Sequence, residues 1–277
     1  MINIKLNKVN ISNESQFVLI AGPCVIESEK HSLFMAEAIK KICEKNNINF
    51  IYKSSFDKAN RSSINSNRGV DIKEAVSIFK KIKNNLNCSI LTDIHNEYQC
   101  EFLANEDCVD ILQIPAFLCR QTDLLVAAGK TNKIINIKKG QFLSPNEIKN
   151  LILKIESTSN KKILITERGT SFGYNNLITD FKGIEIMKKY KYPIIFDATH
   201  SCQQPGGLGD RSGGNREFIE GLSKAAAAIG VAGIFIETHQ DPDNAPSDGP
   251  NMLQLSNLDK LVSKLIKLDQ VTKQIEL

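Results

Sequence analysis

The sequence predicts an α/β protein in which eight parallel strands alternate with eight helices and close into a (β/α)8 TIM barrel. Two observations support this fold class. Short apolar runs rich in β-branched residues recur along the chain, and longer amphipathic segments with helical periodicity separate them. Because eight such βα units follow one another in order, a closed barrel is the architecture that the pattern favours.

Each strand is predicted from an apolar run that polar or turn-forming residues bound. The eight runs cover residues 17–21, 50–54, 89–93, 109–114, 134–138, 162–166, 194–197 and 233–237. Apolar residues at three- and four-residue spacing predict helices over residues 29–44, 71–86, 97–104, 121–128, 145–155, 181–190, 214–229 and 255–271. Ser144 before Pro145 marks the start of the fifth helix, since serine caps helices and proline suits the first helical position.

An open, doubly wound sheet is the alternative architecture. It is less favoured because Gly22, Pro23 and Cys24 follow the first strand, where such folds carry a G-x-G-x-x-G phosphate turn. Residues 1–13 precede the repeat and are expected to form a short hairpin that closes one end of the barrel. Residues 1–277 are therefore interpreted as one barrel domain with an N-terminal extension, a size that single barrels reach.

Composition and charge exclude several classes of protein. A hydrophobic share of 42% with 24% charged residues is too apolar for a disordered chain. The net charge of +4 is small and the basic residues are interspersed with acidic ones, so nucleic acid is not an expected partner. Seven cysteines without a C-x-x-C pair favour a reducing compartment. Because the chain lacks a membrane-length apolar run and a signal-peptide core, we expect a cytoplasmic protein with no membrane partner.

Polar and charged residues lie at the end of every predicted strand. The active site of a (β/α)8 barrel is built at the carboxyl ends of its strands, so these side chains are expected to converge. They are Cys24, Lys53, Asp93, His95, Gln113, Lys138, Arg168, Asp197, His200 and Glu237. Charged groups inside a closed site need partners or ligands. The site is therefore predicted to bind a charged substrate, a metal ion or both.

The cations of this site favour an anionic substrate. They comprise Lys53, Lys58, Arg61, Lys138 and Arg168, which could bind phosphate or carboxylate groups through charge-assisted hydrogen bonds. The loop at residues 53–63 adds hydroxyl and amide groups, as a phosphate pocket requires. The alternative is that these cations are solvated surface residues and the loop an ordinary connector. Lys53 and Lys138 favour the pocket, because each ends an apolar strand.

A second set of residues carries metal-ligand chemistry. Its members are Cys24, His200, Glu237 and Asp248. A thiolate, an imidazole and two carboxylates suit a borderline divalent ion such as Zn²⁺ or Fe²⁺. His239 and Cys202 lie close in sequence to these candidates and are competing ligands. The alternative is that Cys24 is a buried apolar residue and Glu237 a paired carboxylate.

Motifs spread over nearly the whole chain identify a family. They are AGPC at 21–24, IES at 26–28, KSSFDKANRSS at 53–63, QIPAFLCRQTD at 113–123, NIKK at 136–139, FGYNNL at 172–177 and DATH at 197–200. Together they resemble 3-deoxy-D-manno-octulosonate 8-phosphate synthase, also called 2-dehydro-3-deoxyphosphooctonate aldolase. That family condenses phosphoenolpyruvate with D-arabinose 5-phosphate and water in lipopolysaccharide precursor synthesis, releasing phosphate. Its fold is the (β/α)8 barrel, in agreement with the strand count.

The resemblance implies a role for each matching site residue. The residues that it places around phosphoenolpyruvate are Lys53, Lys58, Gln113, Ala116, Lys138 and Arg168. Those that it places around the sugar phosphate are Asn60, Arg61 and Ser62. The family is typically a homotetramer, and Phe117 and Arg120 resemble the residues that reach into a neighbouring subunit's pocket. Asn65, Asn67 and Gln240 depart from the family pattern, which bears on sugar-phosphate affinity.

The resemblance also implies a divalent metal cofactor of the Zn, Fe or Mn type. Metal-dependent members have Cys at the position of Cys24, and metal-independent members have Asn there. The loop at residues 204–210 resembles the metal-dependent group, whereas residues 248–250 resemble a string of the metal-independent group, in which a Cys stands at the position of Ser247. We expect the metal on Cys24, His200, Glu237 and Asp248. The catalytic set is then Lys138, His200, Asp248 and Cys24, with Asp197, His95 and Lys138 as candidates for proton transfer.

Three other functions fit parts of the pattern. The related synthase of 3-deoxy-D-arabino-heptulosonate 7-phosphate shares the barrel, the metal ligands and phosphoenolpyruvate. Residues 59–63 argue against it, because that relative carries a Pro-Arg-Thr type string there. A Schiff-base aldolase would use Lys138. A non-catalytic sugar-phosphate sensor would keep the cations without needing metal ligands, and all four ligands are present here.

Overall fold

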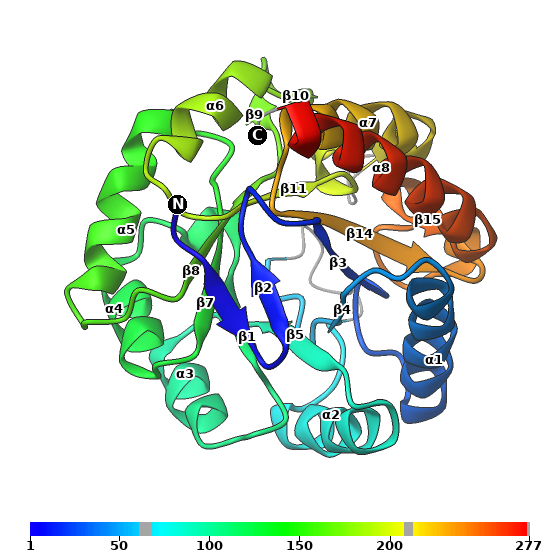
Figure 1. Cartoon of the computed structure of the whole chain (residues 1–277). Coiled ribbons are helices and arrows are strands. Elements are labelled where there is room, and N and C mark those ends of the chain that lie inside the picture. The colour runs from blue at the N-terminus through cyan, green and yellow to red at the C-terminus, as the bar shows by residue number, and fades with distance from the viewer. Residues whose placement is uncertain (61–67, 208–212, 276–277) are drawn as a thin grey trace.

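Parallel strands close into a barrel surrounded by helices (Figure 1). The computed structural model describes residues 1–60, 68–207 and 213–275. Its barrel strands are β3 (Val18–Gly22), β4 (Phe50–Lys53), β5 (Ser89–Asp93), β6 (Ile111–Ile114), β7 (Ile134–Lys138), β8 (Ile163–Glu167), β11 (Ile194–Asp197) and β14 (Gly233–His239). Each strand pairs in parallel with the next, and β14 pairs with both β11 and β3, which closes the ring. The predicted (β/α)8 barrel is confirmed, and the open sheet is wrong.

The helices follow the strands in the predicted order. They are α1 (Glu29–Lys45), α2 (Ile72–Leu86), α3 (Glu97–Ala104), α4 (Thr122–Lys130), α5 (Ile148–Glu156), α6 (Phe181–Lys188), α7 (Ile219–Ile229) and α8 (Leu255–Ile275). The fifth helical segment opens with a 3₁₀ turn, η2 (Pro145–Glu147), at whose start the Ser144 N–H donates to Glu147 Oε2 at 3.0 Å. The predicted helical start at residue 214 is wrong, because α7 begins only after a short strand and the 3₁₀ turn η4 (Arg216–Phe218).

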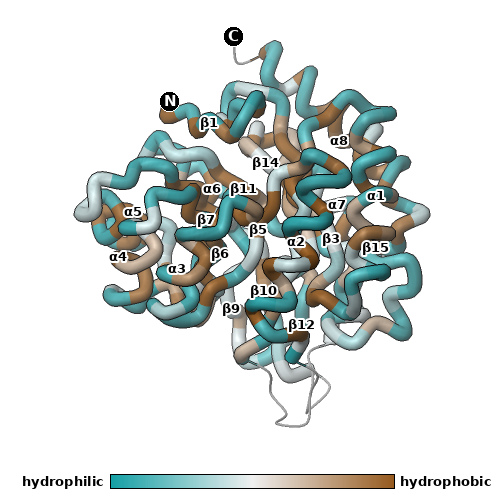
Figure 2. The backbone as a smooth tube through the Cα atoms, turned by 90° about the horizontal axis from the view of Figure 1, so that it is seen from below, coloured by the Kyte–Doolittle hydropathy of each residue, from teal (hydrophilic) through white to brown (hydrophobic). Residues whose placement is uncertain are grey.

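The N-terminal residues form the expected hairpin. Its strands β1 (Ile4–Leu6) and β2 (Val9–Ile11) pair antiparallel, and Ile4, Leu6 and Ile11 are buried against the residues that fill the barrel. Figure 2 shows β1 at one end of the molecule and the short strands β9 (Thr170–Ser171), β10 (Leu177–Ile178) and β12 (Gln203–Gln204) at the other. The hairpin thus covers the amino-terminal end of the barrel, opposite to the predicted site.

Strand alternation places a polar layer on top of the apolar barrel core. Side chains two residues apart on a strand share a face. The apolar core residues Ile51, Leu91, Ile111, Ile134, Leu164, Ile195 and Phe235 are each followed two positions later by Lys53, Asp93, Gln113, Asn136, Thr166, Asp197 and Glu237. The second set is therefore inward-facing and lies nearer the carboxyl end of the strands. All seven of its members are buried.

The outer apolar layer lies between the strands and the helices. It includes fully buried residues from α1, α2 and α5, such as Met35, Phe79 and Ile155. No helix in the described ranges is both long and apolar enough to cross a membrane.

Candidate active site

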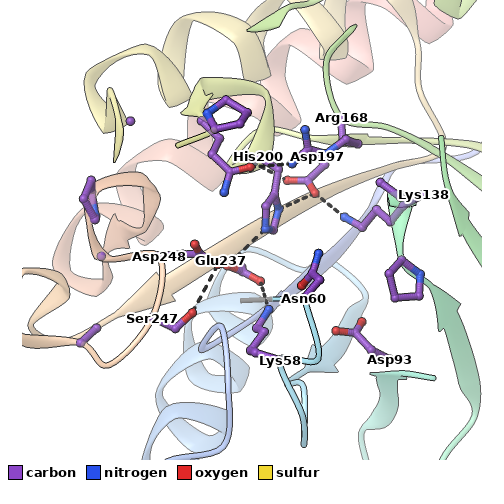
Figure 3. Close-up of a pocket in the computed structure, with 18 of the residues that line it drawn as sticks. Lys58, Asn60, Asp93, Lys138, Arg168, Asp197, His200, Glu237, Ser247 and Asp248 are labelled. Carbon is purple, nitrogen blue, oxygen red and sulfur yellow. Dashed lines mark hydrogen bonds and ion pairs between the residues drawn. The ribbon is translucent and has the colours of Figure 1, made fainter. Parts of the chain in front are cut away.

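The carboxyl ends of the barrel strands surround a cavity of about 950 Å³ (Figure 3). The predicted site residues in its wall are Lys53, Lys58, Asn60, Asp93, His95, Gln113, Ala116, Phe117, Lys138, Arg168, Asp197, His200, Glu237 and Asp248. Cys24 lies behind this wall, 1% exposed, in contact with Asp248. Arg120 is exposed and outside the wall, and Arg61 and Ser62 lie outside the described residues.

Two lysines in the cavity are buried and paired with carboxylates from other strands. Lys53 Nζ forms an ion pair with Glu237 and donates to the Cys24 carbonyl at 2.9 Å. Lys138 Nζ forms an ion pair with Asp197 and lies 3.3 Å from the centre of the Phe235 ring. Burial lowers the pKa of Lys138 from 10.5 to about 8, against the opposing effect of Asp197. Each pairing offsets part of the cost of holding a charge away from water.

Arg168 presents an unused hydrogen-bond donor in the cavity. Its Nη2 donates to Gln203 Oε1 at 2.8 Å, whereas Nη1 is buried and has no hydrogen-bond partner among the described residues. Burial lowers the pKa of this guanidinium, which stays charged because arginine titrates far above neutral pH. A buried, unsatisfied donor on a cation is costly unless an anion binds there. Arg168 is therefore built to receive a phosphate or carboxylate oxygen.

Three of the four predicted metal ligands come together, and the fourth, His200, lies beside one of them. One ligand atom from each of Cys24, Glu237 and Asp248 lies within 4.8 Å of the others. His200 Nε2 lies 3.8 Å from Glu237 Oε2, and that oxygen has no hydrogen-bond partner among the described residues. Cys24 Sγ donates to Asp248 Oδ2 at 3.0 Å. Burial, reinforced by Asp248 and Glu237, raises the pKa of the Cys24 thiol.

Asp197 orients the His200 ring. The Asp197 Oδ2 atom lies 2.7 Å from His200 Nδ1, and Asp197 Oδ1 accepts the His200 backbone N–H at 2.9 Å. The carboxylate can only accept, so Nδ1 carries the proton and the lone pair of Nε2 points away from Asp197. Burial alone would raise the pKa of Asp197, but His200 and Lys138 hold it well below its ordinary value. A carboxylate behind the ring is a common second partner of a metal-binding histidine.

The two competing ligands have other partners. His239 Nδ1 accepts the Asp241 N–H at 3.0 Å, so its Nε2 carries the proton and donates to Glu27 at 2.8 Å. Cys202 Sγ donates to the Ala198 carbonyl at 3.3 Å. Neither side chain is among those that gather around Cys24 in the described structure.

Sequence reasoning missed several residues of the cavity wall. One of them is the cation Arg216, which donates to Asp243 at 2.6 Å and to the Gly249 carbonyl at 2.9 Å. Gln141 and Gln203 also line the wall. Arg216 was not predicted as a site residue because its segment has helical periodicity. Gln141 and Gln203 were not predicted because they do not end a barrel strand. The signal that could have found them is the length of the loops after β7 and β11.

A closed (β/α)8 barrel with buried cations and a thiol, imidazole and carboxylate cluster at its carboxyl end defines an enzyme for small anionic substrates. A family model described as the DAHP synthetase I family matches residues 1–274. The 2-dehydro-3-deoxyphosphooctonate aldolases of Rickettsia prowazekii (strain Madrid E) and Rickettsia typhi (strain ATCC VR-144 / Wilmington) are 57% identical to the chain, over 98% of it and 98% of each relative. The aldolase of that name from Bartonella henselae is 55% identical, over 98% of this chain and 96% of its own. The chain belongs to the DAHP synthetase I family and, within it, to the 2-dehydro-3-deoxyphosphooctonate aldolases.

Proposed function

We propose that the chain condenses phosphoenolpyruvate with D-arabinose 5-phosphate and water, giving 3-deoxy-D-manno-octulosonate 8-phosphate and phosphate in lipopolysaccharide precursor synthesis. The observation that carries the proposal is the set of buried cations in the cavity wall, together with relatives named as 2-dehydro-3-deoxyphosphooctonate aldolases. Both organic substrates are anions. A site for them must overcome their mutual repulsion before it can align the reacting carbons.

The cations of the wall divide between the two substrates. Lys53, Lys58, Lys138 and Arg168 bind phosphoenolpyruvate, with Gln113 and Ala116 beside them. Asn60, which lines the cavity, binds the sugar phosphate together with Arg61 and Ser62. The last two lie outside the described residues. Holding two reactants in a reactive geometry lowers a barrier by up to about 7 to 11 kcal/mol in well-oriented systems.

The reaction forms one carbon–carbon bond and one carbon–oxygen bond, and it breaks a second carbon–oxygen bond. Carbon three of phosphoenolpyruvate attacks the aldehyde carbon of the open-chain sugar, and a water oxygen adds to carbon two. The aldehyde oxygen gains a proton and the water loses one. Phosphate then leaves by cleavage of its bond to carbon two and takes up the second proton of the water, whose oxygen becomes the carbonyl oxygen of carbon two. Lys138 holds a transferable proton near neutral pH, since its pKa of about 8 is close to the working range.

A divalent ion of the Zn, Fe or Mn type is part of the proposal. The donor set fits such an ion, because a thiol and two carboxylates lie together, the His200 imidazole lies 3.8 Å from one of these carboxylates, and Glu237 keeps a buried oxygen without a hydrogen-bond partner among the described residues. Cys24, His200, Glu237 and Asp248 would hold it. When bound, it supplies Lewis acidity toward the sugar aldehyde or its neighbouring hydroxyl, or orients the attacking water. Around it, Asp197 fixes the His200 ring and Lys53 stabilises the charge of Glu237.

The proposal is tested by phosphate release from phosphoenolpyruvate with arabinose 5-phosphate, after chelator treatment and after metal is added back. We expect activity that the chelator abolishes and a divalent ion restores. Activity with erythrose 4-phosphate in place of the pentose phosphate would overturn the assignment in favour of the heptulosonate synthase. Substrate trapped on Lys138 by borohydride would favour a Schiff-base aldolase. Activity that withstands the chelator would remove the metal from the proposal and leave the synthase.

We further propose that the enzyme is a cytoplasmic homotetramer. Phe117 is 55% exposed at the rim of the cavity, and Arg120 is exposed close by in sequence. A second subunit that covers Phe117 would remove this large aromatic side chain from water beside the substrate cavity. Phe117 and Arg120 would then reach the pocket of a neighbouring subunit.

A further inference from the structure

A row of buried polar side chains crosses the barrel below the cavity. Thr166 Oγ1 donates to Asn136 Oδ1 at 2.6 Å, and Asn136 Nδ2 donates to Gln113 Oε1 at 2.8 Å. Gln113 Nε2 donates to Asp93 Oδ1, and Ser55 Oγ donates to Asp93 Oδ2 at 2.5 Å. We call these five residues the donor row. Each of them is at most 6% exposed.

Every hydrogen bond of the donor row points toward Asp93. Burial alone would raise the pKa of Asp93, but Lys53 and Lys58 hold it below its ordinary value, so the carboxylate is charged and can only accept. Gln113 must therefore turn its amide nitrogen toward Asp93, which leaves its oxygen facing Asn136. A reversed amide would set two acceptors against each other on a buried face. The charge of Asp93 thus favours one orientation of the Gln113 amide, and Asn136, which is itself held by Thr166, secures the oxygen end of that amide.

Members of the row differ in their access to substrate. Asp93 and Gln113 line the cavity. Asn136 and Thr166 lie two residues before Lys138 and Arg168 on the same inward face of β7 and β8, one layer deeper, and both are 0% exposed. They are placed to act on substrate only through Gln113.

We propose that Asn136 and Thr166 are positioning residues that keep an N–H donor of Gln113, and not its carbonyl oxygen, available to the anionic substrate. Gln113 Nε2 carries two hydrogens and Asp93 takes one of them, which leaves the second for phosphoenolpyruvate. A reversed amide would present a carbonyl oxygen to an anion and repel it. The inference rests on the proposed function, in which Gln113 contacts phosphoenolpyruvate.

The test is a pair of substitutions at one position. Thr166→Val removes the hydroxyl donor at almost constant volume, whereas Thr166→Ser keeps the donor. We expect Thr166→Val to raise both the dissociation constant, measured by calorimetry, and the KM for phosphoenolpyruvate by about tenfold, as the loss of one buried hydrogen bond predicts. The KM for arabinose 5-phosphate and kcat should stay within about twofold, and Thr166→Ser should restore wild-type values.

A second variant tests the row from its centre. Asn136→Asp places a carboxylate opposite Gln113 Oε1, so no orientation of the Gln113 amide satisfies both of its neighbours. We expect a larger loss of phosphoenolpyruvate affinity than with Thr166→Val. Thermal unfolding of each variant is the control for folding.

The outcomes distinguish a positioning role of these residues from a purely structural role. They also distinguish failure of this inference from failure of the proposed function. Equal phosphoenolpyruvate affinity in wild type and in Thr166→Val, or a parallel loss for both substrates that Thr166→Ser does not rescue, would overturn the inference. A wild-type enzyme that binds phosphoenolpyruvate but consumes no sugar phosphate would remove the proposed function and leave the row testable by calorimetry. Failure of the wild type to bind phosphoenolpyruvate would overturn both.

Discussion

At the scale of single residues, burial sets the chemistry of Lys138. Lys138 is 5% exposed. Its ammonium group pairs with Asp197 and contacts the Phe235 ring. Desolvation outweighs the pairing and lowers its pKa to about 8. The side chain is therefore a cation at neutral pH that loses its charge under mildly alkaline conditions.

This pKa predicts the pH dependence of substrate binding. Protonated Lys138 attracts the anion and neutral Lys138 does not, so phosphoenolpyruvate affinity should be constant below about pH 8 and fall by up to about tenfold per pH unit above it. Calorimetric titration across this range measures the effect. Lys138→Arg keeps its charge and should bind phosphoenolpyruvate with little change up to pH 10. The same alkaline loss in Lys138→Arg would assign the titration to another group.

Cys24 gives a second prediction at the residue scale. Cys24→Ala removes the thiol from the proposed ligand set, and we expect bound metal and activity both to fall by about a hundredfold or more. Metal per chain after chelation and reloading measures the first, and phosphate release the second. Cys202→Ala is the matched control, because that buried thiol bonds the Ala198 carbonyl and should leave metal content unchanged. Full, chelator-resistant activity in Cys24→Ala would contradict the metal site.

At the scale of elements, the pairing of β3 with β4 positions both sets of site residues. Gly22 ends β3, just before Cys24, and β4 ends with Lys53. A Cβ atom built on Gly22 would lie 1.9 Å from the Lys53 carbonyl oxygen, which is backbone and cannot move aside without separating the strands. The strand contact therefore requires glycine, for close approach and not for a special backbone angle.

Gly22→Ala should destabilise the barrel and displace Lys53. We expect a loss of unfolding free energy of about 1 to 3 kcal/mol, measured by urea denaturation, with a fall in activity. Gly221→Ala is the control, because Gly221 lies on the exposed face of α7 and a Cβ there meets nothing within 4 Å. Alanine favours a helix over glycine by about 1 kcal/mol, so this control should be neutral or stabilising. Equal stability of Gly22→Ala and wild type would contradict the packing argument.

At the scale of the whole molecule, exposed aromatic residues gather on the loops at the carboxyl end of the barrel. Phe117, Phe142, Phe172 and Tyr174 are each more than half exposed and follow β6, β7 and β8 in turn. A subunit interface that buries such residues is stabilised, because it removes large apolar surfaces from water. This end of the barrel also carries the cavity, so the proposed subunit interface would lie next to the site.

We expect the mass in solution to be about four times the 30.8 kDa of one chain, measured by light scattering. Phe117→Asp should give smaller species and lower activity, because it puts a charge where the apolar contact is proposed. Phe34→Asp, at a residue 49% exposed on α1, is the control for a surface charge. A Phe117→Asp protein that stays tetrameric and fully active would contradict the interface.

The sequence by itself determined the barrel and the kind of site. Periodicity is a local property, so each strand and helix could be predicted from its own residues. The positions of Lys53, Gln113 and Glu237 at strand ends predicted that they would converge, and all three line the cavity. The motifs identified the family, which the relatives confirm. The late start of α7 was missed, because the helical pattern continues through residues that fold as a short strand and a 3₁₀ turn.

Only the tertiary structure decided which charged side chains of the site form ion pairs and hydrogen bonds with one another. Lys53 meets Glu237 across 184 residues of sequence and Lys138 meets Asp197 across 59, because barrel closure brings the ends of distant strands together. The tertiary structure also shows that His239 has other partners, because its two ring nitrogens bond Asp241 and Glu27. The direction of the donor row follows from the charge of Asp93. These are pairwise, long-range interactions that no local pattern encodes, so they exist only once the ring of strands is closed.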